Sequence, residues 1–112
     1  MIEAAGLPNA QLLADLVRRI VEAVQPRRIV LFGSAARGEL GPDSDLDALV
    51  VVPDGTHPGR AEEAAYRSLW GFGFPVDVLA VTEGDLGRHQ ANPYLVYYWA
   101  LKDGRELYRV AG

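Results

Sequence analysis

Residues 29–52 have the sequence IVLFGSAARGELGPDSDLDALVVV, in which two apolar runs flank a polar stretch. The first run ends at Phe32, and the second carries two acidic residues, Asp45 and Asp47, at its start. Apolar runs of this length, separated by Gly, Ser, Pro and Asp, are typical of buried strands joined by a loop. The stretch predicts strands at 28–32 and 45–52, and a loop at 33–44 with room for one helical turn over 35–38.

The rest of the chain predicts helices on both sides of this strand pair. Asn9 is a plausible cap for a helix that Pro26 ends, and Thr82 with Asp85 forms a capping-box pattern. We expect further elements as follows: a helix over 59–70 with Trp70 towards the core, a strand over 75–81, a helix that begins at Asn92–Pro93 and packs Tyr94 and Tyr98 on the sheet, and a last strand within ELYRV. This order indicates an α/β fold with a small sheet.

Composition limits the possible classes of protein. The chain has 112 residues, a net charge of −4, 49% hydrophobic residues and no cysteine. These values suit a single domain over 1–112 without disulfides or cysteine metal sites, and a cytoplasmic location. The N-terminus lacks a signal-peptide pattern, and no apolar run is long enough to span a membrane. The acidic balance argues against direct nucleic-acid binding.

Asp45 and Asp47 raise an electrostatic problem. Two residues apart in a strand, they project from the same face, roughly 7 Å apart along the chain. Two carboxylates this close repel each other, and the sequence has no Lys or Arg between residues 38 and 59 to offset them. A divalent cation is the natural partner, because Mg²⁺ takes one or two carboxylates together with water and phosphate oxygens.

A third carboxylate, Asp77, lies in the apolar run PVDVLAV at 75–81. If its strand neighbours the strand of Asp45 and Asp47, three acids converge on one metal site. Two metal ions about 4 Å apart could then clamp an in-line phosphoryl or nucleotidyl displacement. In that arrangement Asp77 could also accept the proton of the attacking hydroxyl.

The residues after Phe32 suit phosphate binding. Gly33 lets backbone N–H groups approach a phosphate closely, and the Ser34 hydroxyl can donate a hydrogen bond to it. Arg37 is a candidate to neutralise phosphate charge with its guanidinium group. Plainer alternatives stay open for each side chain: Ser34 as a cap, Arg37 as a solvated loop residue, and the acidic pair as part of a turn and an exposed strand face.

The stretch GSAARGELGPDSDLDALVVV resembles the signature of the DNA polymerase β-like nucleotidyltransferase superfamily, with Gly33 and Ser34 followed by Asp45 and Asp47. FPVDVLAVTEGDL resembles the strand that carries the third acid of that family, here Asp77. The closest branch is the minimal nucleotidyltransferase (MNT) domain. The stretch ALKDGRELYRV also resembles the C-terminal end of this branch.

The resemblance implies a palm fold with a small mixed sheet and flanking helices. It implies two Mg²⁺ ions held by the three acids, and transfer of a nucleoside monophosphate, AMP from ATP in particular, with pyrophosphate leaving. It also implies a partner of the HEPN family, which MNT antitoxins modify on a hydroxyl. Two alternatives stay open: a non-catalytic antitoxin that acts by covering its partner, and a nucleotide sensor.

Overall fold

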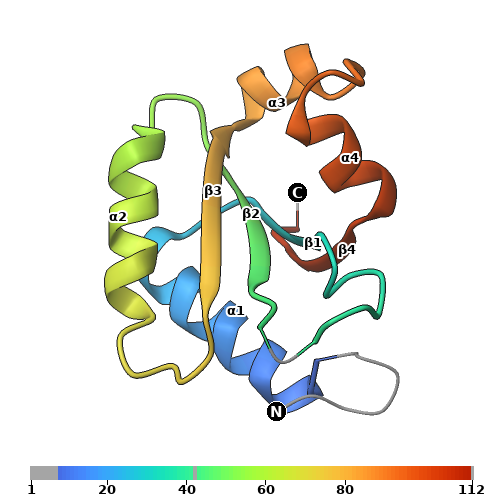
Figure 1. Cartoon of the computed structure of the whole chain (residues 1–112). Helices are drawn as coiled ribbons and strands as arrows, with labels where there is room; N and C mark the ends of the chain where they lie inside the picture. The colour runs from blue at the N-terminus through green and yellow to red at the C-terminus, as the bar shows by residue number, and fades with distance from the viewer. Residues whose placement is uncertain (1–7, 42, 112) are drawn as a thin grey trace.

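The computed structural model describes residues 8–41 and 43–111, which form four helices and four strands (Figure 1). In chain order these elements are α1 (Ala10–Val24), β1 (Arg28–Phe32), β2 (Leu46–Val52), α2 (Pro58–Ser68), β3 (Val76–Thr82), α3 (Glu83–His89), α4 (Val96–Asp103) and β4 (Arg105–Arg109). The strands form one sheet in the order β3-β2-β1-β4. β1 is antiparallel to both of its neighbours, whereas β2 and β3 are parallel. The predicted α/β fold with a small mixed sheet is confirmed.

Helices cover both faces of the sheet. α1 and α2 pack on one face through the larger core cluster, which includes Leu16, Ile20 and Ile29. α3 and α4 pack on the other face through a smaller cluster that includes Leu49 and Leu86 (Figure 1). Side chains alternate between the faces along each strand, so β2 contributes to both clusters and is the most buried strand.

The predicted cap and end of the first helix are confirmed. The Asn9 side chain accepts hydrogen bonds from the backbone N–H groups of Gln11 at 2.7 Å and Leu12 at 3.4 Å. The helix ends at Val24, and its C-cap Gln25 has a left-handed conformation with φ 53°, directly before Pro26. The Thr82 hydroxyl caps α3 in the predicted way, since it accepts from the Asp85 N–H at 3.2 Å.

Three predictions about aromatic residues are wrong, two of them at helix ends. The half-buried Tyr98 belongs to neither core cluster, and Tyr97 packs against the smaller cluster instead. α2 ends at Ser68 rather than at residue 70, so Trp70 leaves the helix face and is 89% exposed. α4 begins at Val96 rather than at Pro93, so Tyr94 precedes the helix and is 93% exposed. In both cases the side chain would face the core only if the helix included it, because the apolar stripe follows the helical period.

None of the helices in the ranges 8–41 and 43–111 is long and apolar enough to cross a membrane.

Candidate active site

The predicted site lies where β1 ends and where the parallel strands β2 and β3 begin. Phe32, the last residue of β1, pairs with Asp47 on β2. Asp47 in turn pairs with Asp77 on β3, in register across the parallel ladder. The Leu46 N–H donates a hydrogen bond to the Pro75 carbonyl at 3.0 Å, which holds the starts of the two strands together. The structure therefore brings the two separated acidic motifs onto adjacent strands.

Asp47 and Asp77 belong to the same face of the sheet. On β2, Asp47 lies on the same face as Leu49 and Val51, because side chains two residues apart in a strand point the same way. Leu49 and Val51 belong to the cluster under α3 and α4. On β3, Asp77 lies on the same face as Val81, which belongs to the same cluster. Asp77 is exposed and Asp47 is half-buried, so the helices leave this end of the face accessible to a ligand. Asp45, directly before β2, is also half-buried.

The electrostatics of the site disfavour an ionised Asp47. Burial raises the pKa of the Asp47 carboxyl above its ordinary value of 3.8, and the neighbouring carboxylates of Asp77 and Asp45 raise this pKa further. Arg37 acts in the opposite direction and lowers it. Repulsion of this kind is relieved by a bound cation, which would favour the ionised form.

The three carboxylates form an open set rather than a closed cage. In the part of the chain that the structure describes, no three His, Cys, Asp or Glu side chains are grouped closely enough to hold a metal ion by themselves. Mg²⁺ rarely needs such a group, because it is bound by one or two carboxylates, several waters and the phosphates of the substrate. The donor chemistry of Asp45, Asp47 and Asp77 thus fits Mg²⁺ when a nucleotide supplies the remaining oxygens.

Gly33 allows β1 to turn directly against Asp47. Its φ is +73°, a left-handed backbone conformation that residues other than glycine rarely adopt. A β-carbon at Gly33 would overlap the Asp47 Oδ2 and lie 3.3 Å from the Asp47 Cγ. The left-handed turn therefore favours glycine at position 33, and any other residue there would displace the Asp47 carboxylate.

Backbone hydrogen bonds close the loop after Gly33 into a compact turn. The Arg37 N–H donates to the Gly33 carbonyl at 3.3 Å, and the Glu39 N–H donates to the Ser34 carbonyl at 2.8 Å. The buried side chains of Ala35 and Leu40 anchor this turn in the larger core cluster. The predicted helical turn over 35–38 is thus present as a turn that places Ser34 at the end of β1.

Arg37 is exposed and forms an ion pair with Glu39, with 3.0 Å between its Nε and the Glu39 Oε1. Glu39 is not among the residues that the sequence motifs single out. Its position two residues after an arginine was the available signal, but this spacing alone is common on loops. The loop ends in a second turn, in which the Ser44 hydroxyl accepts from the Gly41 N–H at 3.0 Å, directly before Asp45.

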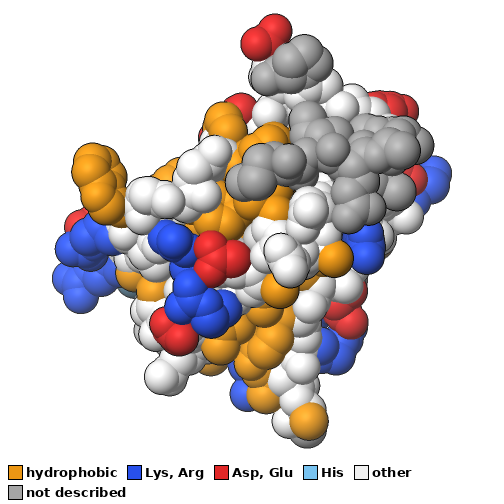
Figure 2. Space-filling model, turned by 90° about the horizontal axis from the view of Figure 1, so that it is seen from below, with side chains coloured by type: hydrophobic (Ala, Val, Ile, Leu, Met, Phe, Trp, Pro, Cys, Tyr) orange, Lys and Arg blue, Asp and Glu red, His pale blue; other side chains and the backbone are white. Residues whose placement is uncertain are grey.

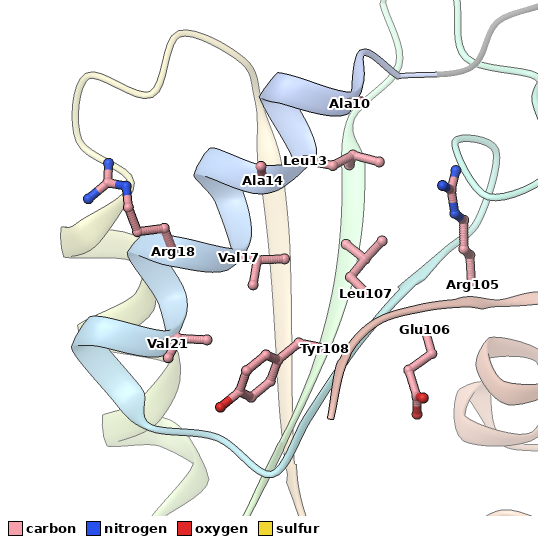
Figure 3. Close-up of a pocket in the computed structure, with 10 residues that line it drawn as sticks. All are labelled: Ala10, Leu13, Ala14, Val17, Arg18, Val21, Arg105, Glu106, Leu107 and Tyr108. Atoms are coloured by element: carbon pink, nitrogen blue, oxygen red, sulfur yellow. The ribbon is translucent and has the colours of Figure 1, made fainter. Parts of the chain in front are cut away.

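An apolar groove of about 490 Å³ lies between α1 and β4, on the sheet face opposite to the carboxylates (Figure 3). Leu13, Val17 and Val21 of α1 line one side, and Leu107 and Tyr108 of β4 line the other. None of the six predicted site residues lines it. The groove is therefore a separate feature from the candidate active site.

Comparison with known proteins assigns the family. The profile of the nucleotidyltransferase domain matches residues 13–103, which is most of the chain and includes every predicted site residue. The chain belongs to this family, and it is a nucleotidyltransferase domain. No curated protein matches the sequence.

Solved structures share the fold. One match is a chain in the crystal structure of a toxin–antitoxin complex with AMP-PNP, with a TM-score of 0.66, 20% identity, and coverage of 88% of this chain and 73% of that chain. Another is a chain in the complex of tri-AMPylated Shewanella oneidensis HEPN toxin with MNT antitoxin, with a TM-score of 0.60, 17% identity, and coverage of 89% and 71%. At these identities the likeness concerns the fold, and the fold expected from the MNT resemblance is confirmed.

Proposed function

We propose that this domain transfers AMP from ATP to a hydroxyl group of a HEPN-family partner protein, in the cytoplasm, as an antitoxin would. The observation that carries the proposal is the register pairing of Asp47 with Asp77, beside the Gly33 turn at the end of β1. Two carboxylates and the turn at Gly33 thus lie at one accessible end of the sheet, which supports binding of a metal ion and a phosphate there. We also propose that residues 1–112 form one domain.

In the proposed reaction, the acceptor oxygen attacks the α-phosphorus of the nucleotide. A new O–P bond forms, the bond from that phosphorus to the bridging oxygen breaks, and pyrophosphate leaves with the electron pair. Asp77, on the exposed end of β3, takes the proton of the attacking hydroxyl. Gly33 and Ser34 bind the triphosphate, and the Arg37 guanidinium offsets its charge.

Asp45, Asp47 and Asp77 would hold two Mg²⁺ ions. When bound with the nucleotide, these ions neutralise charge on the attacking and leaving oxygens. Burial raises the pKa of Asp47 most, and the carboxylates of Asp77 and Asp45 raise it further. A cation beside the three carboxylates would offset the repulsion between them, which supports this assignment.

The test measures intact masses. The purified protein is incubated with Mg²⁺ and each of the four nucleoside triphosphates, with and without the product of the neighbouring gene, and all proteins are weighed by mass spectrometry. We expect an AMP adduct on the partner that is lost in Asp45→Asn and in Asp47→Asn. Asp43→Asn is the matched control, because Asp43 is an exposed acid of the same loop that forms part of a turn. Transfer retained in both Asp45→Asn and Asp47→Asn would contradict the proposal.

Exposed aromatic residues favour a second candidate, a binding module that neutralises its partner by covering it. Trp70, Tyr94 and Trp99 are 89%, 93% and 49% exposed, and aromatic side chains of this kind are enriched at protein interfaces. A variant with Asn at 45, 47 and 77 separates the two functions. Neutralisation of the partner by this variant would favour the binding module, and loss of neutralisation with a stable complex would favour catalysis.

The face shown in Figure 2 does not favour direct nucleic-acid binding. On the face seen from below in Figure 2, basic and acidic side chains lie side by side, with apolar side chains between them. A face with charges of both signs lacks the continuous positive patch that binds a phosphate backbone.

A further inference from the structure

The outer edge of β3 is covered by side chains of α2. β3 is an edge strand, so its outward N–H groups have no neighbouring strand to bind. The Val78 N–H donates to the Tyr66 hydroxyl oxygen at 2.8 Å, and the Ala80 N–H donates to the Glu62 Oε2 at 2.9 Å. The Tyr66 hydroxyl also lies 3.5 Å from the Val78 carbonyl oxygen, to which it can donate. We call Glu62 and Tyr66 the edge clasp.

The spacing of the edge clasp matches that of the strand. Glu62 and Tyr66 are four residues apart on a helix, which is about 6 Å along its axis. Val78 and Ala80 are two residues apart on a strand, which is about 6.6 Å. Because the two distances nearly agree, both hydrogen bonds form at once, and together they attach α2 to β3 at Val78 and Ala80. The sequence does not reveal this pair, because an acid and a tyrosine four residues apart are ordinary on an exposed helix face.

The Tyr66 half of the edge clasp lies next to the candidate active site. Tyr66 binds the backbone of Val78, which directly follows Asp77. Asp77 is the second residue of β3, and the end of a strand frays unless it is held on both sides. β2 holds the inner side of this segment through the register pair of Asp47 and Asp77, and Tyr66 holds the outer side.

We propose that Tyr66, supported by Glu62, is a positioning residue that keeps Asp77 opposite Asp47. This inference rests on the proposed nucleotidyl transfer, because it gives Asp77 a role in metal and nucleotide binding. The edge clasp touches neither substrate nor metal, and it acts through the backbone of β3.

Tyr66→Phe tests the proposal, because it removes the hydroxyl group and keeps the ring. The matched control is Ser68→Ala, which removes the hydroxyl of another α2 residue. This hydroxyl donates to the Ala65 carbonyl within the helix at 2.7 Å, and among the described residues it forms no hydrogen bond with β3. Binding of Mn²⁺ in the presence of a non-hydrolysable ATP analogue is followed by the electron paramagnetic resonance signal of free Mn²⁺. We expect about tenfold weaker Mn²⁺ binding in Tyr66→Phe, the lower end of what residues that orient metal ligands contribute. Ser68→Ala should bind like the wild type.

Amide hydrogen exchange over residues 76–80 gives a second readout that does not depend on catalysis. We expect faster exchange at Asp77 and Val78 in Tyr66→Phe and unchanged exchange in Ser68→Ala. Equal Mn²⁺ affinity of Tyr66→Phe and wild type, or equal weakening by Ser68→Ala, would overturn the proposal. If the wild type binds no Mn²⁺ with the analogue, the proposed function fails, and exchange alone then decides: acceleration at Asp77 supports the positioning role, and its absence overturns it.

Discussion

Gly33, the residue that directly follows β1, lies against the carboxylate of Asp47 on β2. A β-carbon at Gly33 would overlap the Asp47 Oδ2, and the positive φ of Gly33 adds backbone strain to any substitution. We therefore expect Gly33→Ala to move the Asp47 carboxylate and to lower nucleotidyl transfer by about 100-fold, as small displacements of reacting groups can do. Steady-state assays by mass spectrometry measure this loss.

Gly55→Ala is the control for backbone strain. Gly55 has a φ of +94°, but a β-carbon there has no neighbour within 4 Å. Each variant should lose about 1 kcal/mol of unfolding free energy from the left-handed conformation, and only Gly33→Ala should lose activity. Equal activity of the two variants would contradict the role of Gly33 in placing Asp47.

Asp47→Asn should stabilise the metal-free protein at neutral pH. The pKa of Asp47 is raised by burial first and then by Asp77 and Asp45. Between its ordinary pKa and the raised value, the folded state binds more protons than the unfolded state, so stability falls as the pH rises through this window and stays lower above it. The Asn side chain avoids this loss. Because Asp47 is only half-buried, we expect a gain under about 1 kcal/mol, or under about 6 °C in Tm.

Thermal unfolding of wild type and Asp47→Asn in EDTA, at pH 7 and at a pH below the ordinary pKa of 3.8, checks this prediction. The stabilisation should be present at pH 7 and absent at the lower pH, where the carboxyl is protonated in both states. An Asp47→Asn variant that is less stable than wild type at pH 7 would show that the carboxylate is favourably paired in the folded protein.

Glu39→Gln should strengthen nucleotide binding. Glu39 holds the Arg37 guanidinium in an ion pair, and a phosphate must compete for it. An exposed ion pair contributes at most about 1 kcal/mol, so its removal should lower the Kd for the ATP analogue by no more than about fivefold. The control is Glu63→Gln, which releases Arg67 from a similar exposed pair on α2. Isothermal titration measures both. A Kd that falls equally in the two variants would show a general effect of charge and contradict a release of Arg37 towards the phosphates.

Gly104→Ala should destabilise the fold. Gly104 follows α4, and a β-carbon there would overlap the Ala100 carbonyl oxygen and lie 2.6 Å from the Val30 Cγ1. Overpacking of this kind costs about 1–3 kcal/mol, and here one of the overlapping atoms belongs to the backbone. Gly87→Ala in α3 is the control, since its β-carbon would have no neighbour within 4 Å. Urea unfolding should show a lower midpoint in Gly104→Ala alone.

Local chemistry explains why most elements could be predicted from the sequence. Asn9 and Thr82 cap helices as expected, and the apolar runs around Ile29 and Val50 are buried strands. Two of the errors concern helix ends. Trp70 and Tyr94 continue an apolar helical pattern, but the helices end or begin two or three residues away from where the pattern suggests. A periodic pattern indicates a face, and it does not indicate which terminal residues still belong to the helix.

The sequence by itself determined the strands, the Gly-Ser turn and the acidic residues that could form a site, because these depend on residue type and short-range spacing. Only the tertiary structure decided that Asp47 and Asp77, thirty residues apart, are register partners on parallel strands. It also decided that Gly33 closes against Asp47, and that Tyr66 and Glu62 hold the edge of β3. Strand register and edge contacts arise from packing the whole sheet between its helices, and no local pattern contains that information.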